Sequence, residues 1–395
     1  MKEHTVSKLP KIRFKNFEGN WQNFELKNVS EIRTGPFGSA LHASDYVQDG
    51  VPIVTTEHFK NWNLPTRKTD LPQVSAIDYE RLQNYVLKFG DIVFSRVGSI
   101  DINAHVEKIQ DGWLFSGRVL RVRVNSKFNG EYLHHELSTR RVRSSVAARA
   151  VGQTMPCINT EILGSTPICV PNNPTEQTKI GEFFRELDSL IVLHQRKHDK
   201  LVALKTAMLQ KMFPQAGDTT PEIRFKGFEG EWVERTLHHL ADRYDNLRIP
   251  ISGGNRIPGN TPYHGANGIQ DYVHGYTHDG EFILVAEDGA NDVKNYPVQY
   301  VTGKVWVNNH AHVLQAKEGL AETRFLQYAF SQIKVEIFLV GGGRSKLNAE
   351  TMMKIELCAP IDIEEQQKIG TYFRQLDDLI SKHATHDHFF QRIRI

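Results

Sequence analysis

The chain carries two patterns twice, in the same order. RFKNFEGNW at residues 13–21 returns as RFKGFEGEW at residues 224–232, and EQTKIGEFFRELDSLI at residues 176–191 returns as EQQKIGTYFRQLDDLI at residues 365–380. Such a duplication indicates two copies of one folding unit, and 395 residues suit two domains of ordinary size. The sequence therefore predicts a tandem protein rather than one large core.

The ends of the two copies are nearly identical, whereas their centres differ. The first pattern repeats at an offset of 211 residues and the second at 189, so the first copy holds 22 extra residues, between Pro52 and Gly90. Runs rich in β-branched and aromatic residues predict strands in both centres, and residues 130–151 and 322–340 predict helices. Each copy is expected to be a mixed α/β domain with a constant frame and a variable centre.

The second repeated pattern predicts a long helix in each copy. No proline occurs between Glu176 and Phe213, and apolar residues recur there at helical spacing until Pro214 ends the helix. A helix of about 55 Å exceeds what one globular core needs, so we expect the two helices to form an antiparallel pair. The alternative is that each helix packs on its own domain.

Two glycines support close packing of these helices. Gly181 and Gly370 hold equivalent helical positions, where glycine costs about 1 kcal/mol relative to alanine unless two backbones approach there. The candidate residues for packing within the helix pair are Ile180, Gly181, Phe184, Leu187, Ile191, Ile369, Gly370, Phe373, Leu376 and Ile380.

The sequence lacks the motifs of common catalytic sites. No GxxxxGK[ST], GxSxG or HExxH occurs. His194 and His198 are four apart on a helix and could chelate a metal, but a surface or interface position is favoured, so no metal site is predicted. The three cysteines show no CxxC spacing. No apolar run of about 20 residues and no secretion signal are present, so we expect a cytoplasmic protein without membrane contact.

Polar side chains near predicted turns are candidates for DNA contact. A net charge of +2 neither requires nor excludes a nucleic acid. At one shared place the first copy has Arg96 and the second Asp288; arginine suits guanine and a carboxylate suits cytosine, as two readers of different sequences would need. Solvated faces and tight turns are the alternative interpretation. The candidates are Ser39, Thr55, Thr56, His58, Ser95, Arg96, Ser99, Arg118, Arg121, Arg141, Gln153, Thr154, His264, Asn267, Glu287, Asp288, Asn291, Asn309, His310, His312, Arg344 and Lys346.

Three further segments lie between the paired RFxxFEGxW and EQxKIGxxFRxLDxLI patterns: GDIVFSRVGS, YHGANGIQDYV and VWVNNHAHVL. In these patterns and segments the sequence resembles the specificity subunit of a type I restriction-modification system. The resemblance implies α/β (α+β) target-recognition domains in tandem, joined by a long antiparallel two-helix coiled coil in a cyclic pseudo-two-fold arrangement. It divides the chain into a first recognition domain (1–171), a central helical spacer (172–213), a second recognition domain (214–360) and a C-terminal spacer (361–395).

The resemblance also implies a function and partners. Each domain would read one half of a bipartite, asymmetric site in double-stranded DNA, and the helices would dock two modification subunits. This non-catalytic chain would bind no cofactor; S-adenosylmethionine would lie on the modification subunits, and ATP and Mg on the restriction subunits of the full complex. A protein-binding adaptor and a self-contained DNA-modifying enzyme are the alternatives.

Overall fold

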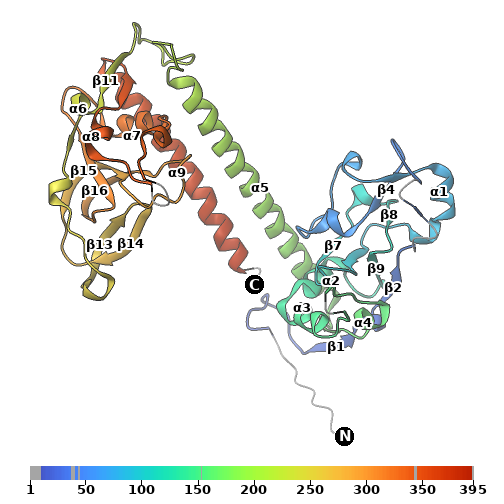
Figure 1. The fold of residues 1–395 in the computed structure, drawn as a ribbon. Helices are drawn as coiled ribbons and strands as arrows, with labels where there is room; N and C mark the ends of the chain where they lie inside the picture. Colours follow the sequence, from blue (N-terminus) through green and yellow to red (C-terminus); the bar gives the residue numbers. More distant parts are fainter. Residues whose placement is uncertain (1–9, 37–40, 43–44, 153, 342–344, 394–395) are drawn as a thin grey trace. The chain divides into compact units, whose positions relative to one another are not determined.

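The computed structural model describes residues 10–36, 41–42, 45–152, 154–341 and 345–393. The chain divides into two compact units, the first formed by residues 1–193 and 387–395 and the second by residues 194–386. Each unit contains one globular α/β part and a segment of long helix (Figure 1).

The first unit is built on strands that pair antiparallel except for β4 and β8, which pair in parallel. Four strands form a sheet in the order β2-β9-β6-β7, four form a smaller sheet in the order β3-β5-β4-β8, and β1 pairs with β10. The smaller sheet includes part of the segment that the second copy lacks. The strands are β1 (Trp21–Glu25), β2 (Ser30–Thr34), β3 (Tyr46–Val47), β4 (Val51–Val54), β5 (Gln73–Val74), β6 (Ile92–Ser95), β7 (Asn103–His105), β8 (Leu114–Phe115), β9 (Val119–Val124) and β10 (Pro167–Pro171).

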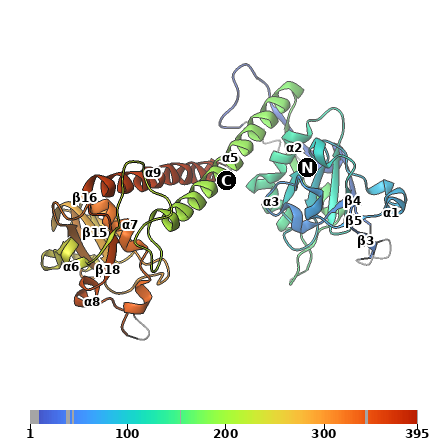
Figure 2. The same ribbon diagram turned by 90° about the horizontal axis from the view of Figure 1, so that it is seen from above.

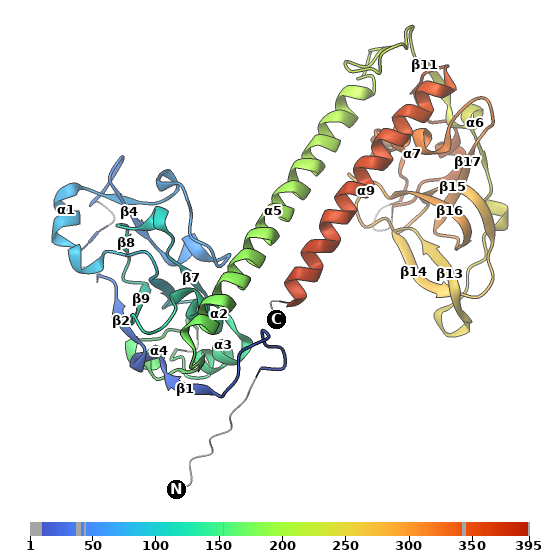
Figure 3. The ribbon, with the colours of Figure 1, turned by 180° about the vertical axis from the view of Figure 1, so that it is seen from behind.

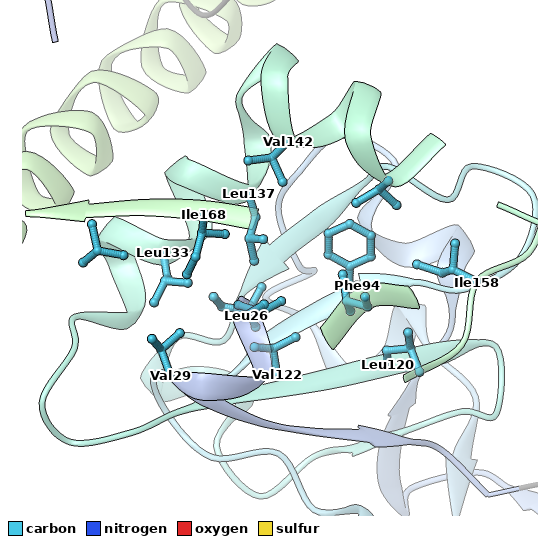
Figure 4. Packing of buried hydrophobic residues seen from close by; sticks show 14 of the residues in the cluster. Leu26, Val29, Phe94, Leu120, Val122, Leu133, Leu137, Val142, Ile158 and Ile168 are labelled. Atoms are coloured by element: carbon cyan, nitrogen blue, oxygen red, sulfur yellow. The ribbon is translucent and has the colours of Figure 1, made fainter. Parts of the chain in front are cut away.

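Helices close one side of the larger sheet. They are α2 (Gly130–Ser138), α3 (Arg140–Ala147) and α4 (Thr160–Gly164). The short helix α1 (Ala76–Arg81) lies instead beside the smaller sheet, where Tyr79 packs with Ile53 and Leu114. Phe94 and Val122 of the sheet pack against Leu133 and Leu137 of α2 and Val142 of α3 (Figure 4). All five side chains are removed from water, which stabilises each by roughly 1.5–3 kcal/mol relative to exposure.

The second unit contains a six-stranded sheet in the order β12-β17-β15-β16-β13-β14 and a separate β11-β18 pair. Its strands are β11 (Val233–Thr236), β12 (Ala241–Arg243), β13 (Pro258–Gly265), β14 (Gly268–Val273), β15 (His278–Ala286), β16 (Val298–Val307), β17 (Ala311–Ala316) and β18 (Glu356–Ala359), and its short helices are α6 (Leu237–Leu240), α7 (Thr323–Ser331) and α8 (Ala349–Met353). Helix α7 packs between this sheet and the long helix α9 (Ile363–Ile393) (Figure 2).

The long helices are α5 (Pro174–Met212) and α9, as the apolar spacing predicts. Within the second unit, the part of α5 from His194 onward runs antiparallel to α9 (Figure 3). His194 Nδ1 lies 2.9 Å from His383 Nδ1, and Lys205 Nζ lies 2.6 Å from Asp377 Oδ1. The antiparallel pairing is therefore confirmed for this segment. In the described part of the chain, no helix is apolar over enough of its length to cross a bilayer.

The sequence predicts that the two helical glycines allow close packing between the long helices, and this prediction is wrong about which element each glycine meets. A Cβ atom on Gly181 would lie 2.9 Å from the backbone nitrogen of Tyr132 in α2, and one on Gly370 would lie 2.9 Å from that of Phe325 in α7. The close approaches therefore join α5 to α2 and α9 to α7. Ile180 likewise packs on the core of the first unit, so each long helix begins by packing on its own domain.

The repeated RFxxFEGxW pattern has a structural purpose. Arg13 makes a bidentate ion pair with Glu176 in the first turn of α5, at 2.6 and 2.8 Å, and also donates to the carbonyls of Glu18 and Gly19. In the second unit, Arg224 and Glu365 repeat this pair at 2.7 and 2.8 Å. The arginine thus fastens the segment that enters each domain to the start of its long helix.

The glutamine that follows each of these glutamates completes the anchor. Gln177 donates to the carbonyl of Pro171 at 2.8 Å and accepts from the amide of Asn129 at 2.9 Å. Gln366 makes the equivalent bonds, to the carbonyl of Pro360 and from the amide of Glu322, at the same two distances. The constant ends of the two copies therefore hold each domain to its own helix.

Candidate nucleic-acid interface

Four loops of the first unit meet at one end of its sheets. The amide of Arg96 donates to the carbonyl of Arg118 at 3.0 Å, that of Gly98 to Pro156 at 2.9 Å, and that of Ser116 to Val54 at 2.9 Å. These bonds bring together residues that are far apart in the sequence. We call this set the first loop surface; it comprises residues 55–58, 96–99, 116–118 and 154–157.

Most of the candidates in this unit lie on the first loop surface. Arg118, Ser99 and Thr154 are exposed. Arg96 is half-buried and joins the loops, since its guanidinium donates to the Thr34 hydroxyl at 3.1 Å and to the carbonyls of Gly117 and Ile158 at 3.1 and 3.3 Å. Its amide-to-carbonyl contacts and its side chain together fix the geometry of this surface.

Thr55, Thr56 and His58 occupy the 3-10 helix η3 (Thr56–Phe59) and the residue before it. The amide of Thr55 donates to Nδ1 of His58 at 3.1 Å, and burial lowers the pKa of His58. A neutral imidazole is consistent with this capping role because a protonated Nδ1 could not accept. All three side chains are half-buried at the edge of the first loop surface.

Two candidates of the first unit are buried, and a third, whose side chain is 48% exposed, is ion-paired within the domain. Ser95 and Arg121 are only 1% and 3% exposed, and Arg121 donates to Glu31 at 2.8 Å. Arg141 pairs with Glu136 and donates to the carbonyl of Pro167, where β10 begins. We leave these three out of the interface. Ser39, Gln153 and Arg344 lie outside the described residues.

The second unit gathers its candidates in the same way. The amide of Glu287 donates to the carbonyl of His310, and that of Leu347 donates to the carbonyl of Glu287, both at 2.8 Å. Asn267 donates to the carbonyl of Gly289 at 2.8 Å and accepts from the amide of Asn291 at 2.9 Å. The second loop surface therefore comprises residues 264–267, 287–291, 308–312 and 345–347, and its exposed side chains include Asn309.

A network of ion pairs holds Glu287 at the centre of this surface. Its carboxylate lies 2.7 Å from Arg248 Nη1 and 2.8 Å from Lys346 Nζ. Burial alone would raise the pKa of Glu287, but the hydrogen bonds from Lys346 and Arg248 outweigh it and hold the pKa below its ordinary value. Nearby, Asp288 accepts from His310 at 2.5 Å.

The two candidate histidines beneath this network are buried. His312 is 1% exposed, and its nitrogens lie 2.7 Å from Asp245 Oδ2 and 2.9 Å from the carbonyl of Leu347. His264 is 5% exposed, and burial lowers its pKa. Ligand atoms of Asp245, Glu287 and His312 lie within 4.8 Å of one another, but Arg248 and Lys346 already supply the positive charge that a metal would bring.

The pKa of Glu287 gives a pH prediction. The pKa of Glu287 in the folded protein is lower than its ordinary value of 4.5. The ion pairs therefore stabilise the second unit fully at a pH above 4.5, and this stabilisation is lost as the pH falls through the lowered pKa. Glu287→Gln should therefore be less stable at neutral pH but should lose less stability on acidification. Urea unfolding across this pH range measures both slopes, and identical slopes would contradict the assignment.

The two loop surfaces share one backbone framework. In the first unit the amide of Ile158 donates to the carbonyl of Arg96 and the amide of Arg96 to that of Arg118; Leu347, Glu287 and His310 repeat this chain of bonds. Arg96 is therefore the equivalent of Glu287, not of Asp288, and the alignment by sequence is wrong by one residue. The segment from Gly280 to Glu287 is one residue longer than the segment from Gly90 to Arg96.

The sequence alone does not identify three residues that contact the candidates: Arg248, Asp245 and Thr34. Arg248 is 39 residues from Glu287, and Thr34 is 62 residues from Arg96. No motif marks these positions, because the contacts arise only when the strands pair. The residues around Thr34 and around Arg248 show no spacing that would predict a contact with Arg96 or Glu287.

The fold and the two loop surfaces define a class of protein: two α/β recognition domains of one design, each anchored to a long helix. Residues 18–203 and 229–386 match the model of the type I restriction modification DNA specificity domain, and the chain belongs to that family. The family is the specificity subunit of these systems, a recognition subunit rather than a catalytic one.

Individual relatives agree with this assignment. A putative type I restriction enzyme specificity subunit of Haemophilus influenzae is 44% identical over 139 residues, a match that covers 35% of each chain. The putative MjaX specificity subunit of Methanocaldococcus jannaschii is 26% identical across 91% of this chain and 88% of its own. The crystal structure of the type I S subunit from M. genitalium has the same fold, with a TM-score of 0.72 over 98% of this chain and 97% of its own, at 14% identity.

Proposed function

We propose that each loop surface reads one half of a bipartite site in double-stranded DNA. The observation that carries the proposal is that one backbone framework presents different side chains in the two copies: Arg96 and Arg118 in the first, Glu287 and His310 in the second. A shared frame with different donors and acceptors is what reading two unlike half-sites requires.

The exposed cations of each surface suit a duplex. Arg118 is exposed beside the shared framework, and the Lys346 side chain is 46% exposed while paired with Glu287. An arginine can hold two acceptors of guanine, whereas a lysine near the backbone neutralises phosphate. The recognition domains would be residues 1–171 and 214–360, with helical spacers at 172–213 and 361–395.

The long helices would dock the partner subunits. Large apolar side chains remain exposed along α5, among them Phe183, Leu190, Leu193 and Leu204. A row of exposed apolar side chains on a helix favours a protein partner. We assign these faces to two modification subunits that carry S-adenosylmethionine, with restriction subunits that use ATP and Mg joining the full complex.

Arg118→Ala tests the DNA-reading role. In the complex assembled with modification subunits, we expect this variant to weaken binding to the cognate duplex by about 1–3 kcal/mol and to relax the choice of base in one half-site. Titration of labelled duplexes at several salt concentrations measures both effects. Lys127→Ala, which removes an exposed cation outside the loop surface, should bind normally.

The adaptor alternative predicts a different result. If the domains bound peptides instead, Arg118→Ala would leave both the affinity for the duplex and the choice of base unchanged. The enzyme alternative predicts that the purified chain alone would methylate or cut DNA. Either outcome would replace the proposed function.

A further inference from the structure

A second cluster of polar side chains lies in the first unit, where helix α2 meets α5. His134 and His135 belong to α2, and Asp188 belongs to α5, two turns beyond Gly181. Each of the three offers a ligand atom, and these atoms lie within 4.8 Å of one another. The cluster is separate from the first loop surface, and no step of DNA reading uses it.

The hydrogen bonds around His134 orient its ring through Nδ1. Asn103 Nδ2 donates to the Ser138 hydroxyl at 3.2 Å, and that hydroxyl donates to the carbonyl of His134 at 2.9 Å. The amide oxygen of Asn103 therefore faces His134 Nδ1, 2.6 Å away. Because this oxygen only accepts, Nδ1 carries the hydrogen of this bond. A carbonyl-type oxygen on one imidazole nitrogen is the usual arrangement behind a metal-binding histidine.

His135 presents a polar atom that the fold leaves unsatisfied. Its Nε2 is buried and has no hydrogen-bond partner among the described residues. The carboxylate oxygen Oε1 of Glu131 lies 3.6 Å from it. The rings of His134 and His135 are 4.8 Å apart between centroids and inclined by 55°. Two nitrogens on one tetrahedral zinc ion are separated by about 3.4 Å, and the ligand atoms of this cluster already lie within 4.8 Å of one another.

The second copy provides an internal comparison. Gly181 approaches Tyr132 as Gly370 approaches Phe325, so Gln327 and Tyr328 are the equivalents of the two histidines. The repeat of the long helices makes Asp377 the equivalent of Asp188. There the Tyr328 hydroxyl donates to Asp377 at 2.7 Å, and Lys205 also pairs with Asp377. The carboxylate is common to both copies, whereas the two imidazoles occur only in the first.

We propose that His134, His135 and Asp188 bind a divalent transition-metal ion of the zinc class. Two imidazole nitrogens and a carboxylate oxygen are the donor set that zinc takes with tetrahedral geometry, and Glu131 offers a further carboxylate for the fourth position. The ion would join α2 to α5 and so fix the first recognition domain on its helix. In the second copy the hydroxyl-to-carboxylate bond of Tyr328 and Asp377 makes that connection without a metal.

Metal titration of the full chain tests this site. Protein stripped with a chelator is titrated with Co²⁺, whose visible absorption reports tetrahedral coordination, and then with Zn²⁺ in competition. We expect one equivalent per chain. His135→Tyr, which installs the residue of the second copy, should weaken the affinity at least about 100-fold, since loss of a second-shell partner alone costs 10–100-fold. His274→Ala, which removes an exposed histidine elsewhere, should leave the affinity unchanged.

A second variant keeps the test decisive if His135→Tyr alters the fold. Asp188→Asn preserves the shape of the side chain and should also weaken the affinity at least about 100-fold, with an unchanged circular dichroism spectrum of the metal-free protein. The proposal is overturned if no equivalent binds, or if one binds with the same affinity in both variants.

Discussion

Replacing Arg224 with alanine should lower the free energy of unfolding of the second unit by about 3 kcal/mol or more. Glu365 is fully buried, and Arg224 supplies both of its close ion-pair contacts, at 2.7 and 2.8 Å. Without the guanidinium, the carboxylate would remain buried with an uncompensated charge. The same change would free the carbonyls of Glu229 and Gly230, so the segment entering the domain would also lose its attachment.

An exposed ion pair nearby supplies the control. Lys211 pairs with Glu222 at 2.5 Å, but their side chains are 45% and 66% exposed. Lys211→Ala should therefore change stability by about 1 kcal/mol or less. Chemical unfolding of the two variants measures the difference. The double variant Arg224→Ala, Glu365→Ala should recover part of the loss; equal stability of Arg224→Ala and Lys211→Ala would refute the anchor.

Exchanging residues 30–165 for those of a relative should change one half of the methylated DNA site and leave the other half intact. The exchanged segment begins with β2 and ends after α4, so it carries the whole first loop surface. The ion pair of Arg13 and Glu176 lies outside it, as do β1 and β10. The ion-pair anchor and the pairing of β1 with β10 therefore stay while the reading surface changes.

Sequencing of modified adenines in host DNA measures this result directly. The matched exchange, residues 241–354 of the second copy, should change the opposite half-site alone. A change in both halves from either exchange would contradict the modular interpretation, and an unchanged site would remove the loop surfaces from DNA reading.

The long helices and the duplicated frame could be predicted because their signals are local. The spacing of Ile180, Phe184, Leu187 and Ile191 specifies a helical face, and Pro214 specifies its end. What that face meets is not a local property. Phe373 and Leu376 pack with the end of α5, as expected for a helix pair. Ile180 packs on the first domain, as expected if each helix packs on its own domain.

The candidate interface was predictable as a set of segments and not as a set of side chains. Loops that follow strands at one end of a sheet meet there, which brings Arg96, Arg118 and Thr154 together. Whether an arginine is exposed depends on its strand partners: Arg121 lies opposite Arg33 in the register of β9 and β2 and is buried against Glu31. Such pairings between distant segments leave no mark in the spacing of the sequence.

The anchor at each long helix closes entirely within its own copy: Arg13 meets Glu176, and Arg224 meets Glu365. Neither of these two ion pairs uses a residue of the other copy. Natural variation can therefore act on one set of loops while the other is inherited unchanged. Recombination can therefore replace the loops that read one half-site in a single step, without any change in the residues that anchor the domain.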